Sequence, residues 1–298
     1  MASTPMLSDI DVRAARRIRA RIRAWGADVV HAHDARSHAL ALIALLGKRG
    51  IPLVVTRRVP FTPRSVRLKY GDRIARFIAI SHAVKKAMIS GGIDAERIDV
   101  VHSGIAIPET AAEPRDWRCE ARWSENTVVC GVVGAMTSEK GLDLLDAIAQ
   151  HLPPPSRESS RLVLLGGPRL AATTIGGIPA LRPGFVEEIE SAVAGLDVLF
   201  HPSRAEGLGT AVLDGMAQGV PPVAFATGGL PEVIVSEESG LLVRPGDVPA
   251  FAEAAARLIA DPDLRRRLGD AAKTRARAFD SRKMTEGTEA VYYRVLTR

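Results

Sequence analysis

The sequence contains only two cysteines, Cys119 and Cys130, and neither belongs to a Cys-x-x-Cys pair. This scarcity excludes a disulfide framework and a cysteine-rich metal centre, so we expect a reduced, cytoplasmic protein. No apolar run approaches the length of a membrane-spanning helix, and the first residues form no apolar signal core. Aromatic residues make up 4% of the chain and do not interleave with its basic residues, which argues against nucleic acid as a partner.

The charge of the chain is distributed unevenly. Residues 1–110 hold 19 Lys and Arg against 9 Asp and Glu, whereas the remaining residues hold 21 against 25. One predicted helix, whose apolar members Ile18, Ile22 and Trp25 recur at helical spacing, carries six arginines: Arg13, Arg16, Arg17, Arg19, Arg21 and Arg23. Two interpretations stay open for this helix, namely peripheral attraction to an anionic membrane or phosphorylated lipid, and an ordinary solvated face.

The chain is long enough for two domains, with 298 residues and 46% hydrophobic composition. Short β-branched runs alternate with helical patterns, which predicts an α/β protein with mainly parallel sheets. Strands are expected at 28–31, 52–56, 77–80 and 99–102, and then at 128–133, 161–165, 196–200, 222–225 and 241–243. Helices are expected at about 35–49, 82–91 and 262–278. Residues 108–126 have the composition of a connection, so we divide the chain into domains at 1–110 and 111–280 and a C-terminal helix at 281–298.

One segment, residues 198–221, combines an anion-binding pattern with two carboxylates. A short apolar strand ends at His201, Glu206 follows in a loop, and a helix then runs to Gly219. The backbone amides at the start of this helix suit a phosphate; they belong to Gly207, Leu208, Gly209 and Thr210. Asp214 lies about two turns further along the helix. Carboxylates on both sides of a phosphate seat suit a nucleotide-sugar, which carries phosphates and hydroxyls.

This segment resembles the C-terminal signature of retaining glycosyltransferases of family 4. The family pattern is Glu, seven residues, Glu, then Gly-Val-Pro and Gly-Gly-x-Pro-Glu, and Glu206, Asp214, 219–221 and 228–232 match it in order and spacing. The resemblance implies the GT-B architecture, with two Rossmann-like parallel-sheet domains facing a cleft and a C-terminal helix that crosses back to pack on the first domain. Only 27 residues precede the Asp-Val-Val-His strand, so we expect a shortened first domain, or one that a partner chain completes.

A second loop resembles the family's Gly-Arg-Leu-x-x-x-Lys-Gly element, in which Arg and Lys grip the donor diphosphate. It follows the strand at 128–133 and carries Ala135 at the arginine position and Lys140 at the lysine position. The resemblance implies that Lys140 contacts the diphosphate alone, unless Arg204 or an arginine of the first domain supplies a second charge.

The nucleobase position of the family corresponds to Gly184, Phe185 and Val186. There the resemblance implies contact between the backbone and the base of the donor. The stretch from Gly167 to Gly184 is several residues short for the family's usual helix and strand.

The acceptor-side candidates of the first domain are His33, Asp34 and Arg58. His33 and Asp34 follow the first predicted strand in a pattern similar to the family's strand-end His-x-His, and for both an ordinary surface role is equally supported. Arg58 stands where a family strand often ends in a cleft histidine, and an arginine there suits the donor diphosphate or an acidic acceptor. His31, inside the strand, is interpreted as a structural histidine.

The resemblance implies a retaining transferase that moves a sugar from a nucleoside-diphosphate-sugar to a hydroxyl, without a cofactor. Glu206 would contact the hydroxyls of the donor sugar, Asp214 the ribose, and Lys140 the leaving diphosphate. No metal is expected, because fixed donors of the protein would replace it, and the triplets Asp9–Asp11 and Asp261–Asp263 suit helix caps. A cell-envelope glycan or glycolipid is the suggested acceptor, on the inner membrane face.

Two other interpretations are kept. One is a sugar-nucleotide isomerase, which would convert the donor without an acceptor. The other is a non-catalytic or partner-dependent nucleotide-sugar-binding protein, which Ala135, the short 167–184 stretch and the short first domain favour.

Overall fold

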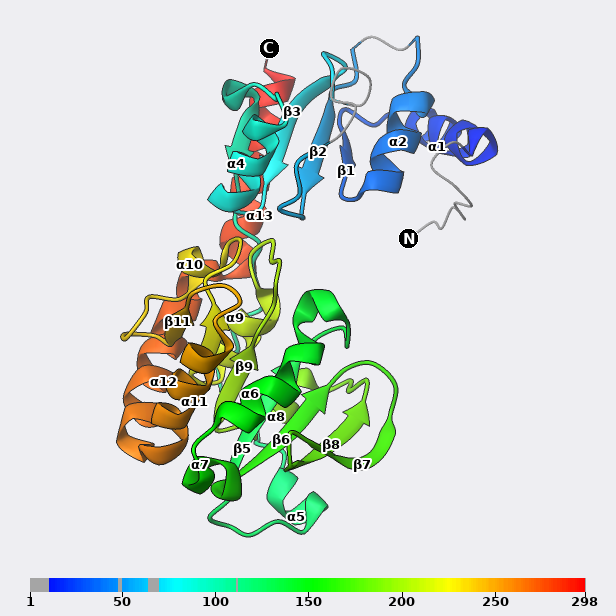
Figure 1. The fold of residues 1–298 in the computed structure, drawn as a ribbon. Helices are drawn as coiled ribbons and strands as arrows, with labels where there is room; N and C mark the ends of the chain where they lie inside the picture. Colours follow the sequence, from blue (N-terminus) through cyan, green and yellow to red (C-terminus); the bar gives the residue numbers. More distant parts are fainter. Residues whose placement is uncertain (1–10, 48–49, 64–69, 111, 298) are drawn as a thin grey trace. The chain divides into compact units, whose positions relative to one another are not determined.

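The structure is a computed structural model that describes residues 11–47, 50–63, 70–110 and 112–297 (Figure 1). The chain divides into two compact units: the first joins Met1–Ser103 to Arg282–Arg298, and the second is Gly104–Ser281. The first unit therefore ends earlier than the expected boundary at 110. The reason is that Ile105 belongs to the second unit, where its amide donates to the Phe279 carbonyl at 3.0 Å and its carbonyl accepts from the Ser281 amide at 2.8 Å.

The first unit is built on a four-stranded sheet in the order β1-β2-β3-β4, in which all neighbouring strands are parallel. Its elements are α1 (Val12–Ala24), β1 (Val30–Ala32), α2 (Ala35–Ala44), β2 (Leu53–Arg57), β3 (Ile74–Ala79), α4 (His82–Ser90), the short turn η1 (Ala95–Arg97), β4 (Ile98–Val100) and α13 (Ser281–Leu296). The helix predicted at 35–49 ends at Ala44; residues 48 and 49 lie outside the described residues.

Two helices from opposite ends of the chain complete the first unit. The arginine-rich α1 packs on α2 through Ala14 and Ala15 (Figure 1). The C-terminal α13 lays Val291 and Val295 against Val54 of the sheet. Both helices therefore pack on the first unit through small or β-branched residues.

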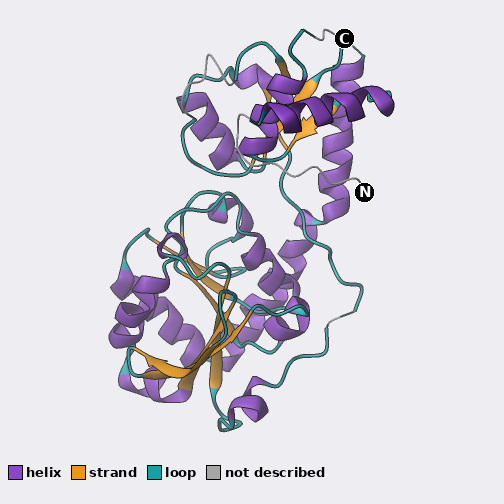
Figure 2. Ribbon diagram, turned by 90° about the vertical axis from the view of Figure 1, so that its right-hand side faces the viewer, coloured by secondary structure: helices purple, strands orange, loops and turns teal. Residues whose placement is uncertain are grey.

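The second unit contains a seven-stranded sheet in the order β11-β10-β9-β5-β6-β8-β7, with helices on both faces (Figure 2). Its strands are β5 (Val128–Val133), β6 (Ser160–Leu165), β7 (Leu170–Ile175), β8 (Ile178–Gly184), β9 (Val198–His201), β10 (Pro222–Phe225) and β11 (Leu241–Val243). Its helices are α5 (Trp117–Ala121), α6 (Leu145–His151), α7 (Pro154–Ser159), α8 (Ile189–Ala194), α9 (Thr210–Ala217), α10 (Leu230–Val233), α11 (Val248–Ala260) and α12 (Pro262–Ala276), with short turns η2 (Ser138–Lys140), η3 (Leu142–Leu144) and η4 (Arg277–Phe279). Every residue of the central β5 is buried, as the apolar run of a strand covered on both faces requires.

An antiparallel hairpin, β7–β8, stands where the family would have a helix followed by a strand. Ile175 pairs with Ile178 across a two-residue turn, Gly176-Gly177, in which both residues have positive φ (+54° and +85°). Two consecutive positive φ values form the tight turn that matches the twist of a hairpin, and glycine is the residue that adopts them without strain. The hairpin accounts for the short stretch between Gly167 and Gly184.

The two Asp-x-Asp triplets lie at helix starts. Asp11 accepts a hydrogen bond from the Ala14 amide at the start of α1, and Asp261 accepts from the Leu264 amide at the start of α12, both at 2.9 Å. These contacts confirm the predicted caps, while Asp9 lies outside the described residues. None of the helices in the described ranges combines the length and apolar character that a membrane span needs.

Candidate active site

Glu206 and Lys140 meet at the ends of two paired strands of the second unit. Glu206 lies in the loop after β9, and Lys140 ends the η2 turn after β5, the neighbour of β9 in the sheet. The Lys140 ammonium forms an ion pair with Glu206 Oε1, and the buried His201 places its Nε2 atom 2.8 Å from the same oxygen. From the sequence these residues belong to separate motifs, and His201 had no assigned role.

The charge state of Glu206 follows from these two partners. Burial raises the pKa of Glu206, but the hydrogen bond and charge of His201, followed by those of Lys140, outweigh burial and lower the pKa from 4.5 to about 2. Glu206 is therefore an ionised carboxylate at neutral pH. In that form it accepts hydrogen bonds from hydroxyl groups and has no proton to donate.

Backbone contacts lock the loop after β5 against the loop after β9. The Arg204 amide donates to the Glu139 carbonyl at 2.8 Å, and Ser203 Oγ donates to the same carbonyl at 3.1 Å. Gly141 has φ +74°, and a Cβ at this position would lie 2.0 Å from the Pro202 carbonyl oxygen. The two loops therefore approach more closely than any residue with a side chain at position 141 would allow.

Helix α9 begins directly after the Glu206 loop. Its N-cap is Gly209, which has no capping side chain among the described residues, and the Gly209 carbonyl accepts from the amides of Val212 and Leu213. The stretch from Gly207 through Leu208 to Thr210 leads into this first turn, with Leu208 buried as its anchor. An N-terminus without a capping side chain is the arrangement in which helix amides accept a phosphate.

Asp214 lies on α9, half-buried beside α8. Burial and the nearby charge of Glu190 raise the pKa of Asp214 from 3.8 to about 6. The pKa values of Asp214 and Glu206 are thus shifted in opposite directions. Glu206 stays ionised far below neutral pH, whereas Asp214 is protonated once the pH falls below about 6.

We expect Asp214→Asn to stabilise the ligand-free protein at about pH 8 by about 2 kcal/mol, and by less as the pH falls toward about 4. The folded-state pKa lies above the unfolded-state value, so the protonated carboxyl favours folding and this contribution is lost as the pH rises through about 6. Urea unfolding of both proteins at the two pH values measures it. Asp270→Asn, at an exposed aspartate of α12, is the control. An equal change at both pH values would contradict the assignment.

Arg204, which we expect to contact the sugar donor, instead binds residues of the loop after β5. Its guanidinium binds Asp143 at both carboxylate oxygens, at 2.6 and 2.8 Å, and also the Ser138 carbonyl at 2.5 Å. This bidentate pair holds the η2–η3 segment around Lys140. The pair with Asp143 offsets the charge of Arg204 but leaves its Nε–H and one further N–H without an acceptor among the described residues.

Gly184, Phe185 and Val186 lie at the carboxyl end of β8, next to the end of β6. Phe185 is 83% exposed, and Phe185 and Val186 line an open hollow of about 780 Å³ together with Arg169 and Arg182 of the hairpin. An exposed aromatic ring just past the carboxyl end of a strand offers a stacking surface for a planar group.

The acceptor-side candidates gather at the carboxyl ends of β1 and β2 in the first unit. His33 and Arg58 line a cavity of about 270 Å³ and a second one of about 200 Å³, and Asp34 lines the second. The Asp34 carboxylate caps α2, where it accepts from the amides of Arg36 and Ser37 at 2.8 and 2.9 Å. The structure therefore gives Asp34 a capping role that the sequence did not suggest.

His31 is held from both sides of its ring. Its Nδ1 atom lies 2.6 Å from the Tyr292 hydroxyl of α13, and its Nε2 atom lies 2.7 Å from Thr56 Oγ1 of β2. Burial, followed by the charges of His33 and Arg58, lowers the pKa of His31 from 6.5 to about 3. His31 is a neutral, fully bonded structural histidine.

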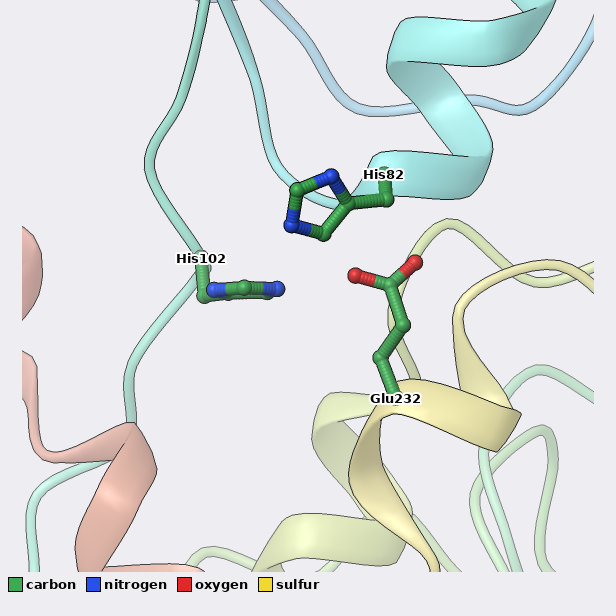
Figure 3. A group of neighbouring side chains, drawn as sticks. All are labelled: His82, His102 and Glu232. Atoms are coloured by element: carbon green, nitrogen blue, oxygen red, sulfur yellow. The ribbon is translucent and has the colours of Figure 1, made fainter.

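A histidine pair, His82 and His102, lies elsewhere in the first unit (Figure 3). The two rings meet edge to face with centroids 5.7 Å apart. Glu232, drawn with them, belongs to α10 of the second unit. Two histidines from one unit do not complete the three- or four-ligand set of a protein metal centre, so we assign no metal to them.

The family of the chain follows from a sequence profile that covers most of its second unit. The sequence profile described as "Glycosyl transferases group 1" matches residues 115–275, which is more than half of the chain. The chain belongs to this family. A second profile, "Glycosyltransferase Family 4", matches residues 3–107. The resemblance inferred from the 198–232 motif is thereby confirmed.

The curated relatives of this glycosyl transferase chain are 28–32% identical to it over the residues that align. Sulfoquinovosyl transferase SQD2 of Arabidopsis thaliana is 28% identical over 90% of the chain and 57% of the relative. D-inositol 3-phosphate glycosyltransferase of Corynebacterium diphtheriae is 32% identical over 56% of the chain and 42% of the relative. The chain thus spans about half the length of these relatives. An α-(1→4)-mannosyltransferase of Mycolicibacterium hassiacum is 29% identical and matches the whole chain.

Solved structures confirm the predicted GT-B fold class. HepE of Anabaena in complex with UDP-glucose has a TM-score of 0.82 at 22% identity, covering 94% of this chain and 82% of that one. Sucrose-phosphate synthase from Thermosynechococcus elongatus has a TM-score of 0.76 at 19% identity, covering 98% and 81%.

Proposed function

We propose that this family member transfers a sugar, with retention of anomeric configuration, from a nucleoside-diphosphate-sugar to a hydroxyl acceptor. The observation that carries the proposal is the meeting of Lys140 with the ionised Glu206 in a loop that leads into α9. A cation and a helix N-terminus suit a diphosphate, and a permanent carboxylate suits sugar hydroxyls. Two findings support this choice of donor: the chain belongs to the glycosyl transferase family, and its fold resembles that of HepE, which was solved in complex with UDP-glucose.

Each residue of the site has a proposed role. Glu206 accepts hydrogen bonds from hydroxyls of the donor sugar, and Asp214 contacts the ribose. Lys140 and the amides of the stretch 207–210 stabilise the negative charge that grows on the departing diphosphate. The base lies against 184–186, where Phe185 is exposed. We propose a metal-independent reaction in which the leaving phosphate oxygen takes the acceptor proton, because Glu206 is ionised and these donors supply the positive charge.

The acceptor side is proposed for the first unit, at His33, Asp34 and Arg58. The exposed face of α1, which carries Arg13, Arg16, Arg17 and Arg23, suits peripheral contact with an anionic membrane. A cytoplasmic enzyme that builds a cell-envelope glycan or glycolipid fits this charge pattern.

The proposal is tested by thermal shift with UDP, GDP and ADP and their sugars. A ligand at 100 times its dissociation constant stabilises the folded protein by about 2.7 kcal/mol, which gives a clear rise in Tm. We expect UDP or UDP-glucose to raise the Tm of the wild type, and Glu206→Ala, which removes the contact with the sugar hydroxyls, to lower the rise with UDP-glucose more than the rise with UDP. No rise with any nucleotide would refute the donor site.

A second candidate is a partner-dependent nucleotide-sugar-binding protein. It is favoured by Ala135, which removes the family's arginine, and by the Asp143 pair that occupies Arg204. Such a protein would show the same Tm rise but would release no nucleoside diphosphate when incubated alone with donor and acceptor.

A further inference from the structure

Arg58 differs from the other arginines that lie near it in the first unit. Its neighbour Arg57 donates to the Tyr70 hydroxyl and the Phe61 carbonyl, at 3.0 and 2.9 Å. The one hydrogen bond that Arg58 makes to a described residue is long, 3.5 Å to Ser103 Oγ. Within the described part of the chain, no carboxylate pairs with the Arg58 guanidinium, so its charge is not neutralised.

This charge faces a built cavity. The 270 Å³ cavity is lined by Arg58, His31 and His33, by Thr288, Glu289 and Tyr292 of α13, and by apolar side chains that include Ile78, Ile80 and Val101. His31, held by Tyr292 and Thr56, lies against His33 with ring centroids 3.9 Å apart and the two ring planes tilted by 39°.

The cavity is electrostatically prepared for an anion. Burial and the charge of Arg58 lower the pKa of His33, against a smaller opposite effect of Asp34. Both groups are exposed to solvent, and the charge of Arg58, which no described carboxylate pairs with, disfavours a second positive charge on His33. An anion placed between the two would relieve this effect, so the pKa of His33 would rise and His33 would take up a proton.

We propose that this cavity binds an oxyanion, and that the hydroxyl acceptor of the reaction carries a phosphate or carboxylate group that Arg58 recognises. The inference deepens the proposed function. It rests on that function only where it assigns the anion to the acceptor substrate, and the anion site itself does not depend on it. Glu289, an exposed carboxylate of α13 that also lines the cavity, is an acceptor for hydrogen bonds from hydroxyl groups and disfavours an anion close to it. The cavity therefore suits a polyhydroxy compound with one anionic group.

The test is an NMR titration of the full chain with inorganic phosphate. The His33 Cε1–H signal is assigned by its loss in His33→Asn and then followed against pH with and without phosphate. We expect a saturable shift and a higher pKa of His33 in the presence of phosphate. Arg58→Gln should weaken phosphate binding at least about tenfold, Arg58→Lys should recover part of it, and Glu289→Gln should strengthen it. Arg36→Gln, which removes a nearby exposed arginine outside the cavity, should change the affinity less than twofold.

Two further titrations, with acetate and with UDP, identify the source of the anion. Binding of acetate with the same dependence on Arg58 indicates a carboxylate acceptor, whereas selectivity for phosphate indicates a phosphorylated one. Displacement of phosphate from His33 by UDP would assign the cavity to the donor and overturn the acceptor role. Absence of a saturable shift at millimolar phosphate, or equal binding in Arg58→Gln, would overturn the anion site itself. Neither result depends on donor binding to the second unit, so failure of the proposed function would be seen separately in the nucleotide Tm panel.

Discussion

Replacement of Lys140 by alanine is expected to remove about 2–4 kcal/mol of transition-state stabilisation, the usual cost of losing one donor at a developing oxyanion. Negative charge grows on the leaving diphosphate during transfer, and Lys140 is the cation that the structure holds beside the Glu206 loop. The loss should therefore fall on kcat more than on KM. The rate of UDP release from the donor sugar that stabilises the wild type measures it.

Two variants separate chemistry from folding. Lys140→Arg keeps a cation in the loop and should recover part of the rate. Lys86→Ala, at an exposed lysine of α4, should leave kcat and Tm unchanged. A wild-type kcat in Lys140→Ala would remove Lys140 from the proposed mechanism.

The second large effect is expected from Gly141→Ala. A positive φ costs an alanine about 1–2 kcal/mol. The added Cβ would also lie 2.0 Å from the Pro202 carbonyl oxygen, which is backbone and has no other rotamer to adopt. We expect a total loss of about 3–5 kcal/mol in the free energy of unfolding, together with weaker nucleotide binding, because the loops of Lys140 and Glu206 are pushed apart.

Gly246→Ala is the matched control for this collision. Gly246 has φ +81°, close to that of Gly141, but a Cβ there meets no atom within 4 Å. Its substitution should cost only about 1–2 kcal/mol. Urea unfolding compares the two variants, and equal losses would show that the approach of the loops contributes nothing beyond backbone strain.

Local patterns carried most of the fold prediction. The predicted strands of both units match β1 to β6 and β9 to β11 to within a few residues, because buried parallel strands are continuous apolar runs and helix caps are short-range features. Asp11 and Asp261 were recognised as caps for the same reason. The hairpin was missed, although its signal, Gly176-Gly177 between two isoleucines, stands in the sequence.

The candidate site was predicted as separate motifs and assembled only in three dimensions. Glu206 and Lys140 are 66 positions apart, as are Arg204 and Ser138, and His31 and Tyr292 are 261 apart. No local pattern links such residues. Because neighbouring strands are parallel, the loops that follow them lie at the same end of the sheet. Charged side chains from distant parts of the chain come into contact there.

The sequence by itself determined the alternation of strands and helices, the phosphate-suited start of α9 and the family to which the chain belongs. These depend on residues close together along the chain, where backbone geometry and capping chemistry act directly. Only the tertiary structure decided that Arg204 is neutralised by Asp143 while Arg58 has no carboxylate partner among the described residues. The charge available to a ligand depends on which residues the fold brings within hydrogen-bonding distance, and two arginines with the same chemistry therefore have different roles.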